Sequence, residues 1–557
     1  MKKLKTKIFK YWPVLILFLA TLVLLRFFFK PGFPETHDGQ SHLARLANFH
    51  IAAIDRHFPI RWARNLNYKF GYPVFHFNYY TPYALALFPK LLGFDFEASF
   101  KIVFFLSLFI GGFFWYLLFK KKFGQLPALV AGLFYISAPY QLVNIFVRGS
   151  VGEIVALGLF PFLFWSLDRL IDKPSRFSFS IATLGLATLA LTHNISFFFG
   201  VPILFIYSLI LIRQKKDWRR LWPVLLSFGF SVALTLFFWI PALFEKKFTN
   251  MDAIDMSHEY VLHFPTLKQL IYSPWGNGFS VPGPDDGFSF QLGPFHWLAA
   301  IFSLGLLLTQ SLKKKIKRIN WLWCFFGLVF AASIIFMNQA TLPIWRVLPM
   351  VRYIQFPWRL LSFAIIAVVF LVVQLAKKNH RLGLALALGA LLYTSLIARP
   401  GGWFNWDNHF YYEFPFSSSI KGLNMPKWFE HWKNMYLKPG NIFDLSGTGS
   451  IREISWKTQK HVYQVNADQD TEILERTAYF PGWEVRVDGQ LVPINYQRKD
   501  YPGVISFKLP AGQHTVETKF TENTPARRLG DSISLFSLIA FIFIFVSNWP
   551  LKHYEKK

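Results

Sequence analysis

The sequence is poor in cysteine, in charge and in acidic side chains. It holds one cysteine, Cys324, which excludes an intrachain disulfide even in a segment that faces an oxidising compartment. Only 16% of the 557 residues are charged, and 31 Asp and Glu stand against 59 Lys and Arg. The resulting formal net charge of +28 raises the question of a nucleic-acid partner. No internal repeat or low-complexity tract is present.

What the sequence has in abundance is apolar and aromatic side chains. The composition is 53% hydrophobic and 19% aromatic, with 65 Phe and 20 Trp, which is far from an average soluble domain. The basic residues form short clusters between long apolar runs, as cytoplasmic loops do, rather than one basic surface. The composition therefore predicts an α-helical polytopic membrane protein, and we discount nucleic-acid binding.

Apolar runs of spanning length recur along the chain and predict about twelve spans. The first run follows a basic segment like that of a signal peptide, but it has about 18 residues and no small-x-small cleavage site after it, so we expect it to stay attached. The runs fall at residues 12–29, 99–119, 125–143, 151–168, 177–192, 195–212, 221–244, 293–311, 321–337, 360–376, 382–398 and 529–548.

The loops between these runs alternate between short basic segments and long segments. The positive-inside rule places the basic ones, such as "KKLKTKIFK", "RQKKDWRR" and "KHYEKK", in the cytoplasm, together with the N-terminus. The long loops then lie outside the cytoplasm. We expect a membrane domain at 1–398 with external loops 31–98, 245–292 and 338–359, an external domain at 399–528, and a final span and tail at 529–557.

The external C-terminal segment carries the alternation of β-strands. In "GWEVRVDGQLVPI", Trp483, Val485 and Val487 face one way, and Asp488-Gly489 is a hairpin turn signal. A second strand pair is expected in "GVISFKLPAGQHTVETKF", with its turn at Pro510-Ala511-Gly512. These two pairs predict a small extracytoplasmic domain that resembles a β-sandwich.

The first titratable cluster follows the first apolar run, in "FFFKPGFPETHDGQSHLARLANFH". After Asp38, the apolar positions of residues 43–54 share one helical face and predict an amphipathic interfacial helix. One interpretation makes Asp38 the N-cap of this helix and leaves His37 and His42 solvated. The other makes Asp38 a functional carboxylate at the membrane surface.

Several segments, taken in order, resemble one family. They are "THDGQSHLARL", "FPIRWARNLNYKFGYPVFHFNYYTPY", "VRGSVGE", "LTHNISF", "LPMVRYIQFPWRLLSF", "YFPGWEVRVDGQLVPI" and "LPAGQHTVE". Together they make the chain similar to the bacterial GT-C-type membrane glycosyltransferases. The closest resemblance is to the membrane proteins labelled "6-pyruvoyl-tetrahydropterin synthase-related", with YfhO-like proteins as relatives.

The resemblance implies a GT-C-like fold, a location in a plasma membrane of the bacterial type, and a reaction. In characterised members of that superfamily an acidic residue of the first external loop is the general base, and a polyprenyl phosphate carries the sugar. Asp38 matches that position, with His37 and Glu35 beside it. The expected ligands of the donor phosphate are Arg148, Arg352 and Arg359, and the expected lining of the substrate cavity is His42, Glu153, His193 and Gln355.

Structural alternatives exist for these residues. Arg148 and Glu153 could form an ion pair that orients a loop, and His193 could belong to a tight turn. The arginines could extend from the membrane interface toward water, with their charged ends solvated. Many members of the superfamily carry a paired acidic motif for a divalent metal, whereas this loop offers Glu35, His37 and Asp38. Mn²⁺ or Mg²⁺ is therefore not firmly implied, and Asp38 and His37 are its weak candidate ligands.

The hypothesis is inverting transfer of a sugar from a polyprenyl-phosphate donor to an external glycan, lipid or protein acceptor, in contact with membrane lipids. A first alternative is a non-catalytic relative that binds glycan or assists surface-polymer assembly. A second is a flippase or transporter, which predicts charged or broken helices near the middle of the bilayer.

Overall fold

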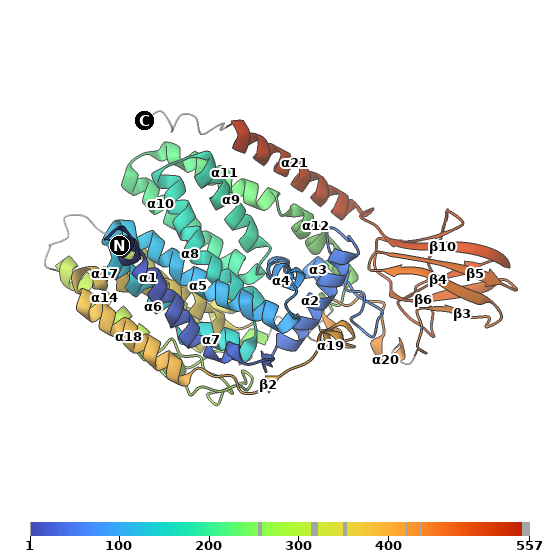
Figure 1. The fold of residues 1–557 in the computed structure, drawn as a ribbon, viewed down its shortest axis with the longest axis horizontal. Coiled ribbons are helices and arrows are strands. Elements are labelled where there is room, and N and C mark those ends of the chain that lie inside the picture. Colours follow the sequence, from blue (N-terminus) through green and yellow to red (C-terminus); the bar gives the residue numbers. More distant parts are fainter. Residues whose placement is uncertain are drawn as a thin grey trace.

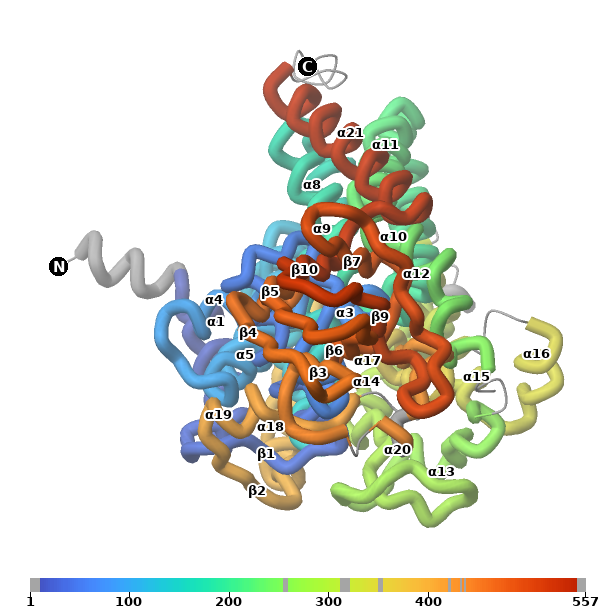
Figure 2. The backbone as a smooth tube through the Cα atoms, turned by 90° about the vertical axis from the view of Figure 1, so that its right-hand side faces the viewer, coloured from blue at the N-terminus to red at the C-terminus, as the bar shows by residue number. Residues whose placement is uncertain are grey.

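The computed structural model describes residues 2–253, 259–312, 321–348, 354–418, 422–434 and 437–547. A long helical bundle carries a β-domain at one end (Figure 1). The loop helices α2 (Gly39–Ile54), α3 (Val74–Phe77), α4 (Thr81–Leu91) and α19 (Asn408–Tyr412) lie between the bundle and the β-domain, whereas the N-terminus lies toward the far end of the bundle. In Figure 2, which looks onto the β-domain, the strands lie in front of the bundle.

Every apolar run expected from the sequence coincides with a helix or a pair of helices. These are α1 (Lys2–Leu24), α5 (Phe96–Phe123), α6 (Gln125–Ile136) with α7 (Pro139–Val143), α8 (Val151–Asp172), α9 (Arg176–Ala190), α10 (Asn194–Lys215), α11 (Leu221–Ala233) with α12 (Leu236–Glu245), α14 (Pro294–Leu312), α15 (Trp321–Phe336), α17 (Leu361–Lys378), α18 (His380–Ile397) and α21 (Pro525–Ser547). Short helices α13 (Leu267–Ile271), α16 (Leu342–Val347) and α20 (His431–Asn434) lie in the long loops.

Six of the described helices are long and apolar enough to cross a membrane, and up to nine spans result if each bent pair counts as one. The bent pairs are α6 with α7, at 42°, α11 with α12, at 54°, and α15 with α16, at 89°. In the first pair Ala138 is extended ahead of Pro139, because a residue that precedes proline avoids the helical region. The single run 125–143 is therefore two helices.

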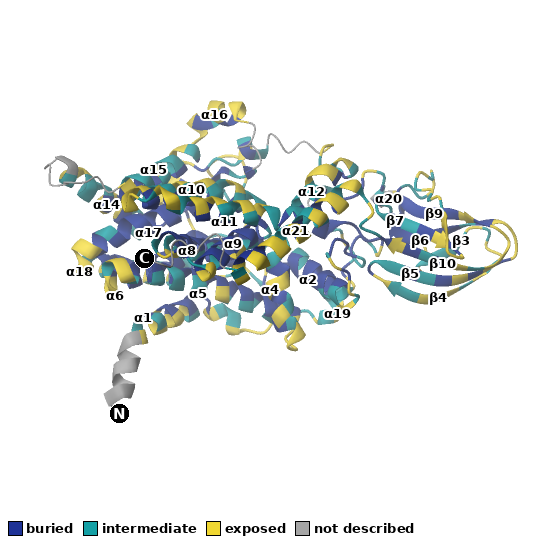
Figure 3. Ribbon diagram, turned by 90° about the horizontal axis from the view of Figure 1, so that it is seen from above, coloured by how far each residue is buried: buried dark blue, intermediate teal, exposed yellow. Residues whose placement is uncertain are grey.

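Helix α2 is buried on both faces. Its apolar positions Leu43 and Leu46 are buried as expected, but the polar residues His42, Arg45 and Asn48 are only 5%, 8% and 1% exposed. The helix packs against α4, α5 and α19. The expectation of a solvated His42 is therefore wrong, because the polar face of α2 has protein rather than water opposite it. Figure 3 shows exposed residues instead on outer helices such as α16 and α18.

The β-domain consists of two sheets that pack face to face. One has the strand order β4-β5-β10-β7-β8 and the other β3-β6-β9. Buried Glu475 on β6 accepts hydrogen bonds from Tyr463 on β5 and Thr518 on β10, so it joins the two sheets. The strands are β3 (Ile442–Asp444), β4 (Ser450–Lys457), β5 (Lys460–Ala467), β6 (Thr471–Ala478), β7 (Trp483–Val487), β8 (Gln490–Val492), β9 (Val504–Leu509) and β10 (Gly512–Phe520).

Of the two expected hairpins, one is confirmed and one is wrong. Strands β7 and β8 pair through Val487 and Gln490, and Asp488 and Gly489 take φ of 49° and 83°, as a tight hairpin turn requires. Strand β9 pairs with β6, however, whereas β10 pairs with β5 and β7. The turn at residues 510–512 therefore carries the chain from one sheet to the other.

A buried charged network, which we call the joint, fixes the β-domain to the bundle. Arg527 of α21 is fully buried and donates to Glu245 of α12 at 2.9 Å. The same guanidinium donates to the carbonyl oxygens of Pro481, at 2.7 Å, and Thr521, at 2.8 Å, both in the β-domain. The side chain of Arg527 thus connects α21 to α12 and to the β-domain.

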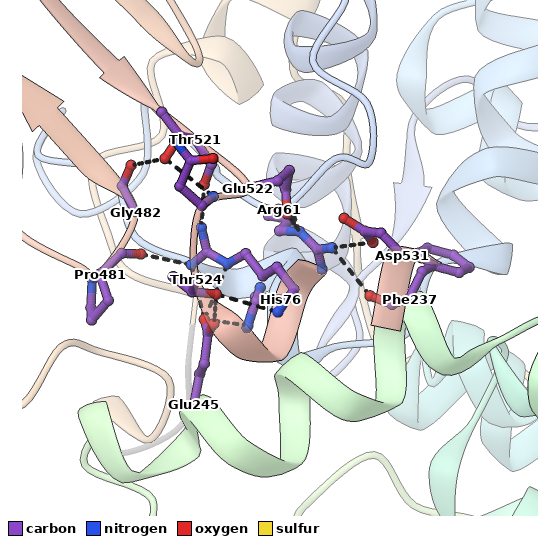
Figure 4. A network of polar contacts seen from close by, with 12 residues as sticks. Arg61, His76, Phe237, Glu245, Pro481, Gly482, Thr521, Glu522, Thr524 and Asp531 are labelled. Carbon is purple, nitrogen blue, oxygen red and sulfur yellow. Dashed lines mark hydrogen bonds and ion pairs between the residues drawn. The ribbon is translucent and has the colours of Figure 1, made fainter. Parts of the chain in front are cut away.

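The first external loop also enters the joint. Arg61 is 2% exposed, donates to Glu522 at 2.8 Å and lies 3.2 Å from Asp531 (Figure 4). His76, fully buried, has its Nε2 3.0 Å from an oxygen of Glu245. The joint therefore connects the first loop, α12, the end of the β-domain and α21.

His57, beside the joint, predicts sensitivity to acid. It is 4% exposed, packs edge-on against Phe520, and neither ring nitrogen has a hydrogen-bond partner in the described chain. Burial, with Arg61 and Arg527 nearby, lowers the pKa of His57 from 6.5 to about 3. The unfolded chain takes up this proton below about pH 6.5 and the folded chain does not, so stability is lost as the pH falls from 6.5 toward 3.

The substitution His57→Phe is expected to flatten this acid dependence. Between pH 6 and 4 the unfolding free energy of the wild type should fall by up to about 1.4 kcal/mol more per pH unit than that of the variant. Denaturant titration of both proteins in detergent at several pH values measures this difference. The exposed His409 serves as control, since His409→Phe should leave the slope unchanged. Parallel curves for the wild type and His57→Phe would contradict the prediction.

Candidate functional site

Two segments far apart in the sequence hold each other through their main chains. The backbone N–H of His37 donates to the carbonyl of Val147 at 2.9 Å, and that of Asp38 donates to the carbonyl of Arg148 at 3.0 Å. Gly149 then turns the chain away with φ of 64°. These contacts place Asp38 directly beside Arg148.

Asp38 stands at the N-cap position of α2, yet its side chain does not cap the helix. The hydroxyl oxygen of Thr36 accepts the hydrogen bond from the backbone N–H of Gly39 at 3.0 Å instead. The Asp38 side chain is half-buried and, within the described residues, its carboxylate accepts no hydrogen bond. The interpretation of Asp38 as a capping side chain is therefore wrong, because Thr36 leaves that carboxylate available for other chemistry.

Gly149 lies where only glycine fits, which gives a second prediction. A Cβ at Gly149 would overlap the Thr36 hydroxyl and lie 3.1 Å from the backbone nitrogen of Gly39. We expect Gly149→Ala to cost at least about 2 kcal/mol, since a left-handed conformation alone costs 1–2 kcal/mol for a residue with a Cβ. Thermal unfolding in detergent measures the loss.

Gly447 supplies the matched control for that substitution. It has φ of 73°, but nothing lies within 4 Å of its Cβ position, so Gly447→Ala carries the cost of the conformation without the overlap. An equal loss for the two variants would show that the close approach of Gly149 to the Asp38 loop is unimportant.

Arg148 and Glu153 form a buried ion pair. The π-helical turn η2 (Asn144–Arg148) ends at Arg148, whose Nη1 lies 2.6 Å from Glu153 Oε2. The same nitrogen donates to the amide oxygen of Asn144 and to the Tyr140 hydroxyl, at 3.3 Å for the latter. Its guanidinium lies over the ring of Trp358, 4.6 Å from the centroid. The structural interpretation of this pair is thus observed, and it fixes the guanidinium next to the Asp38 loop.

Arg359 brings a second cation to the same carboxylate. Its Nη1 donates to the carbonyl of Ile354 at 2.9 Å and to Oε1 of Gln355 at 3.2 Å. Its Nε lies 3.9 Å from Glu153 Oε2 and donates no hydrogen bond among the described residues. Two guanidinium groups therefore share one carboxylate, which favours an anion nearby. Arg352, the other expected phosphate ligand, lies outside the described residues.

A small cavity opens beside these groups, with room for about one water molecule. Its polar lining comes from the starts of the three helices α8, α10 and α17 and from Arg359 in the 3-10 turn η8 (Pro357–Leu360) ahead of α17. The lining residues are Glu153, His193, Ile195, Ser196, Phe199, Ile354, Arg359, Leu360, Ser362 and Phe363. Of the four residues expected to line the substrate cavity, Glu153 and His193 both line this cavity. Gln355 lies beside it, where it accepts a hydrogen bond from Arg359, and His42 does not line it.

His42 belongs to a buried cluster with two tyrosines. Its Nδ1 lies 2.8 Å from the Tyr83 hydroxyl, and its Nε2 lies 3.3 Å from the Tyr79 hydroxyl. Burial, reinforced by Arg45, holds the pKa of His42 well below 6.5, so the ring is neutral at pH 7. Tyr79 also meets His193 edge-on, so it stands between the α2 cluster and the cavity.

His37 is covered by the second long loop. Its ring stacks on Phe279 with centroids 4.5 Å apart, and its Nε2 lies 3.3 Å from the carbonyl of Asn277. Burial lowers the pKa of His37, and the backbone contact with Asn277 offsets this in part. A short hairpin in which Asn277 bridges Phe288 therefore lies over the Asp38 loop.

The weak candidate metal ligands Asp38 and His37, and Glu35 of the same loop, do not form a metal-binding group. Glu35 is exposed and lies against Gly402, while the His37 ring is engaged by Phe279. Nowhere in the described chain do three His, Cys, Asp or Glu side chains come close enough to hold a metal ion. The residues present therefore do not form a metal site, and no step is derived through one.

Sequence reasoning missed several polar partners of the site. Tyr140, Asn144 and Arg148 recur every four residues, a spacing that places them on one helical face and could have revealed them. Ser362, three residues after Arg359, donates to Glu153 at 3.0 Å. Tyr79 carried no such signal, since its contact with His42 depends on how the first loop folds.

The fold and the buried polar site define a helical membrane protein with a C-terminal β-domain. A family model described as the 6-pyruvoyl-tetrahydropterin synthase related domain, a membrane protein, matches residues 77–401. The chain belongs to this family, which confirms the resemblance to the 6-pyruvoyl-tetrahydropterin synthase-related membrane proteins. The matched segment contains Arg148, Glu153, His193 and Arg359, whereas Asp38 and the β-domain lie outside it.

The chain is also similar to an uncharacterized protein of Lactococcus lactis subsp. cremoris (strain MG1363). The two are 24% identical over 258 residues, which is 44% of this chain and 42% of that protein. The match thus spans less than half the length of this curated relative.

Proposed function

We propose that the protein transfers a sugar from a polyprenyl-phosphate carrier to an acceptor outside the membrane, with inversion at the anomeric carbon. The observation that carries this proposal is the pairing of an uncapped, half-buried carboxylate, Asp38, with a buried cationic cluster held beside it by main-chain bonds. A base beside an anion site is what displacement of a phosphate by a hydroxyl requires.

In the proposed reaction Asp38 takes the proton of the acceptor hydroxyl as its oxygen bonds to the anomeric carbon. The bond between that carbon and the phosphate oxygen breaks, and the phosphate leaves with the electron pair. Arg359 would balance the charge that grows on the leaving oxygen, while Arg148, already paired with Glu153, would hold the geometry. His37 and Glu35 have no step in this scheme.

The proposal includes a membrane arrangement. In this arrangement the six long helices, the three bent pairs and the three shorter apolar helices each cross the membrane, which makes about twelve spans. The N-terminus lies in the cytoplasm. The Asp38 loop and the β-domain would lie outside, where the β-domain could meet a glycan, lipid or protein acceptor. The grouping of the loop helices and the β-domain at one end of the bundle supports this arrangement (Figure 1).

A second candidate function is lipid-linked glycan transport. The bends of 42° and 54° within apolar helix pairs favour it, because transporters bind substrate at broken helices. Against it, the charged groups of the site lie at helix starts and ends rather than within long helices. A non-catalytic relative that binds glycan or assists assembly is the third possibility.

The experiment that tests the proposal measures release of polyprenyl phosphate from a panel of lipid-linked sugars. The full-length protein is purified into lipid vesicles and assayed with and without Mn²⁺ or Mg²⁺. Release accompanied by glycosylation of an added acceptor supports the glycosyltransferase. Movement of the intact lipid-linked sugar across the vesicle membrane, without release, would identify a transporter. Binding without release or movement would identify a non-catalytic protein.

A further inference from the structure

Three short helices of the external loops show apolar side chains to the outside. They are α4, α13 and α16, which we call the collar, and none of them belongs to an apolar run of spanning length. One face of each packs on the protein, through Tyr83, Leu270 and Trp345, which are at most 1% exposed. Another face of each is open and carries apolar side chains that are 45–77% exposed, namely Leu85 and Phe88, Leu267 and Ile271, and Ile344 and Val347. Apolar side chains gathered on one face mark an interaction surface.

Each collar helix is joined to one end of a long apolar helix. Only residues 92–95 separate α4 from α5. The carbonyl of Leu270 in α13 accepts a hydrogen bond from the indole of Trp297 in α14 at 2.8 Å. Helix α16 follows α15 after a short turn, and Trp345 donates back to the carbonyl of Phe336 at 3.1 Å. These are the ends that the proposed membrane arrangement places outside.

The bend between α15 and α16 gives the direction of α16. The two helices meet at 89°. Helix α15 has 16 residues and is therefore about 24 Å long, which is most of the hydrocarbon thickness of a bilayer. With α15 across the bilayer, α16 lies along the membrane surface. In Figure 2 the collar helices lie apart around the bundle, α4 on the left, α16 on the right and α13 at the lower right.

The collar helices also share a charge pattern. They contain one basic residue each, Lys90, Lys268 and Arg346, and no Asp or Glu. An apolar face with a long cationic side chain suits the boundary between acyl chains and lipid phosphates, because the stem stays in the apolar layer while the charge reaches the phosphate. Helix α2, for which the sequence predicted this place, is buried on both faces instead.

Each collar helix belongs to a loop that builds the candidate site. Helix α4 packs against α2, which begins directly after Asp38. In α13, Gln269 donates to Asp286 at 2.7 Å, within the hairpin that lies over the Asp38 loop. In α16, Trp345 forms an apolar cluster with Ile354, which lines the small cavity. The collar therefore contacts all three loops around the site.

We propose that the collar lies in the outer surface of the bilayer, where its apolar side chains contact phospholipid acyl chains and its three cations contact the lipid phosphates. In this position the membrane holds the three loops around Asp38 and supports the geometry of the site. The inference goes beyond the proposed function, because it concerns the membrane as a partner and requires no reaction. Neither of its tests measures sugar transfer, so the two proposals can fail separately.

The first test measures where the collar side chains lie in phospholipid vesicles that contain the full-length protein. The one cysteine, Cys324, is replaced by alanine, and a nitroxide is attached to the new cysteine of Phe88→Cys, Ile271→Cys or Val347→Cys. Dissolved oxygen concentrates among acyl chains, whereas a nickel chelate stays in water, so the rates at which they collide with the nitroxide give its depth. We expect oxygen to reach all three labels and the chelate to be largely kept from them.

Two exposed leucines calibrate this measurement. Leu491 on β8 is 62% exposed, and a label at Leu491→Cys should meet the chelate freely. Leu388, near the middle of α18, is 52% exposed, and a label at Leu388→Cys should lie deeper than the collar. Collar labels as open to the chelate as Leu491→Cys would overturn the inference, as would labels as deep as Leu388→Cys. Shielding from both reagents would mean that a second copy or another protein covers the collar, which would overturn it too.

The second test measures whether the collar holds the loops of the site. In Phe88→Asp a carboxylate replaces the ring, and loss of a buried Phe side chain corresponds to about a ten- to hundredfold change in an equilibrium constant. The backbone N–H groups of His37 and Asp38 donate to main-chain carbonyls across the site. We therefore expect their hydrogen exchange, measured in vesicles, to be about ten- to a hundredfold faster in Phe88→Asp than in the wild type.

Leu491→Asp is the matched control for this substitution. It places the same carboxylate at an exposed apolar position of the β-domain, so exchange at residues 37 and 38 should stay as in the wild type. Phe88→Ser, which also removes the ring, is measured in parallel in case Phe88→Asp does not fold. Exchange unchanged in a folded Phe88 variant, or equally fast in Leu491→Asp, would overturn the anchoring of the site by the collar.

Discussion

The proposed sugar transfer is expected to fall about a hundredfold to ten-thousandfold in Asp38→Asn, the range that loss of a general base produces. The amide has the shape of the carboxylate but cannot take the acceptor proton. The fold should persist, because Thr36 and not Asp38 accepts the hydrogen bond at the start of α2. Initial rates of polyprenyl phosphate release, with the donor identified in the vesicle assay, measure the effect.

Glu35→Gln is the matched control for this substitution. It removes a carboxylate from the same loop, three residues away, where the side chain is exposed and lies against Gly402. The variant should therefore keep its activity, and both proteins should unfold at the temperature of the wild type. Equal losses in the two variants would point to the charge of the loop rather than to a base. Unchanged release in Asp38→Asn would remove Asp38 from the chemistry.

The joint gives the largest expected effect on stability. We expect Arg527→Leu to lower the free energy of unfolding by about 3–5 kcal/mol, the usual cost of leaving one partner of a buried ion pair alone. Glu245, with a side chain 3% exposed, would keep its charge without the guanidinium that faces it at 2.9 Å. The carbonyls of Pro481 and Thr521 would lose their donor as well.

Two further variants test whether charge or packing carries this effect. Among the described residues, the side chain of the adjacent Arg528 donates only to Asn523, at the surface, so Arg528→Leu should change stability by less than about 0.5 kcal/mol. The double substitution Arg527→Leu with Glu245→Leu should be more stable than Arg527→Leu alone, because no buried charge then remains unpaired. Denaturant unfolding in detergent compares all four proteins. A double variant no better than the single one would contradict the charge argument.

Local patterns predicted the elements but not their partners. The apolar runs gave the position of each long helix, and Asp488-Gly489 gave the hairpin of β7 and β8. The alternation of apolar residues did not predict the partners of β9 and β10. Such alternation shows which face of a strand is buried, but it does not show which strand pairs with it. The break before Pro139 was missed because the length and hydropathy of the run 125–143 suit a single span, although the proline itself signals a break.

The candidate site shows a similar division. The chain order of its motifs led to Asp38, Arg148, Glu153, His193 and Arg359. Helical periodicity, however, detects only an apolar stripe, so it could not show that His42 is buried against Tyr79 and Tyr83. Nor could it place Glu35 against Gly402, since that contact depends on the pairing of β1 (Phe33–Pro34) with β2 (Trp403–Phe404).

The sequence by itself determined that this is a helical membrane protein of the 6-pyruvoyl-tetrahydropterin synthase related family, because length, hydropathy and short motifs are properties of contiguous residues. Only the tertiary structure decided that Thr36 replaces Asp38 as the cap, that Glu153 lies beside both Arg148 and Arg359, and that His193 lines a small cavity with Glu153 and Arg359. The contact between Glu153 and Arg359 joins segments far apart in the sequence, and the local Thr36 cap depends on where the backbone points that side chain, whereas local preferences fix only the element that carries each residue.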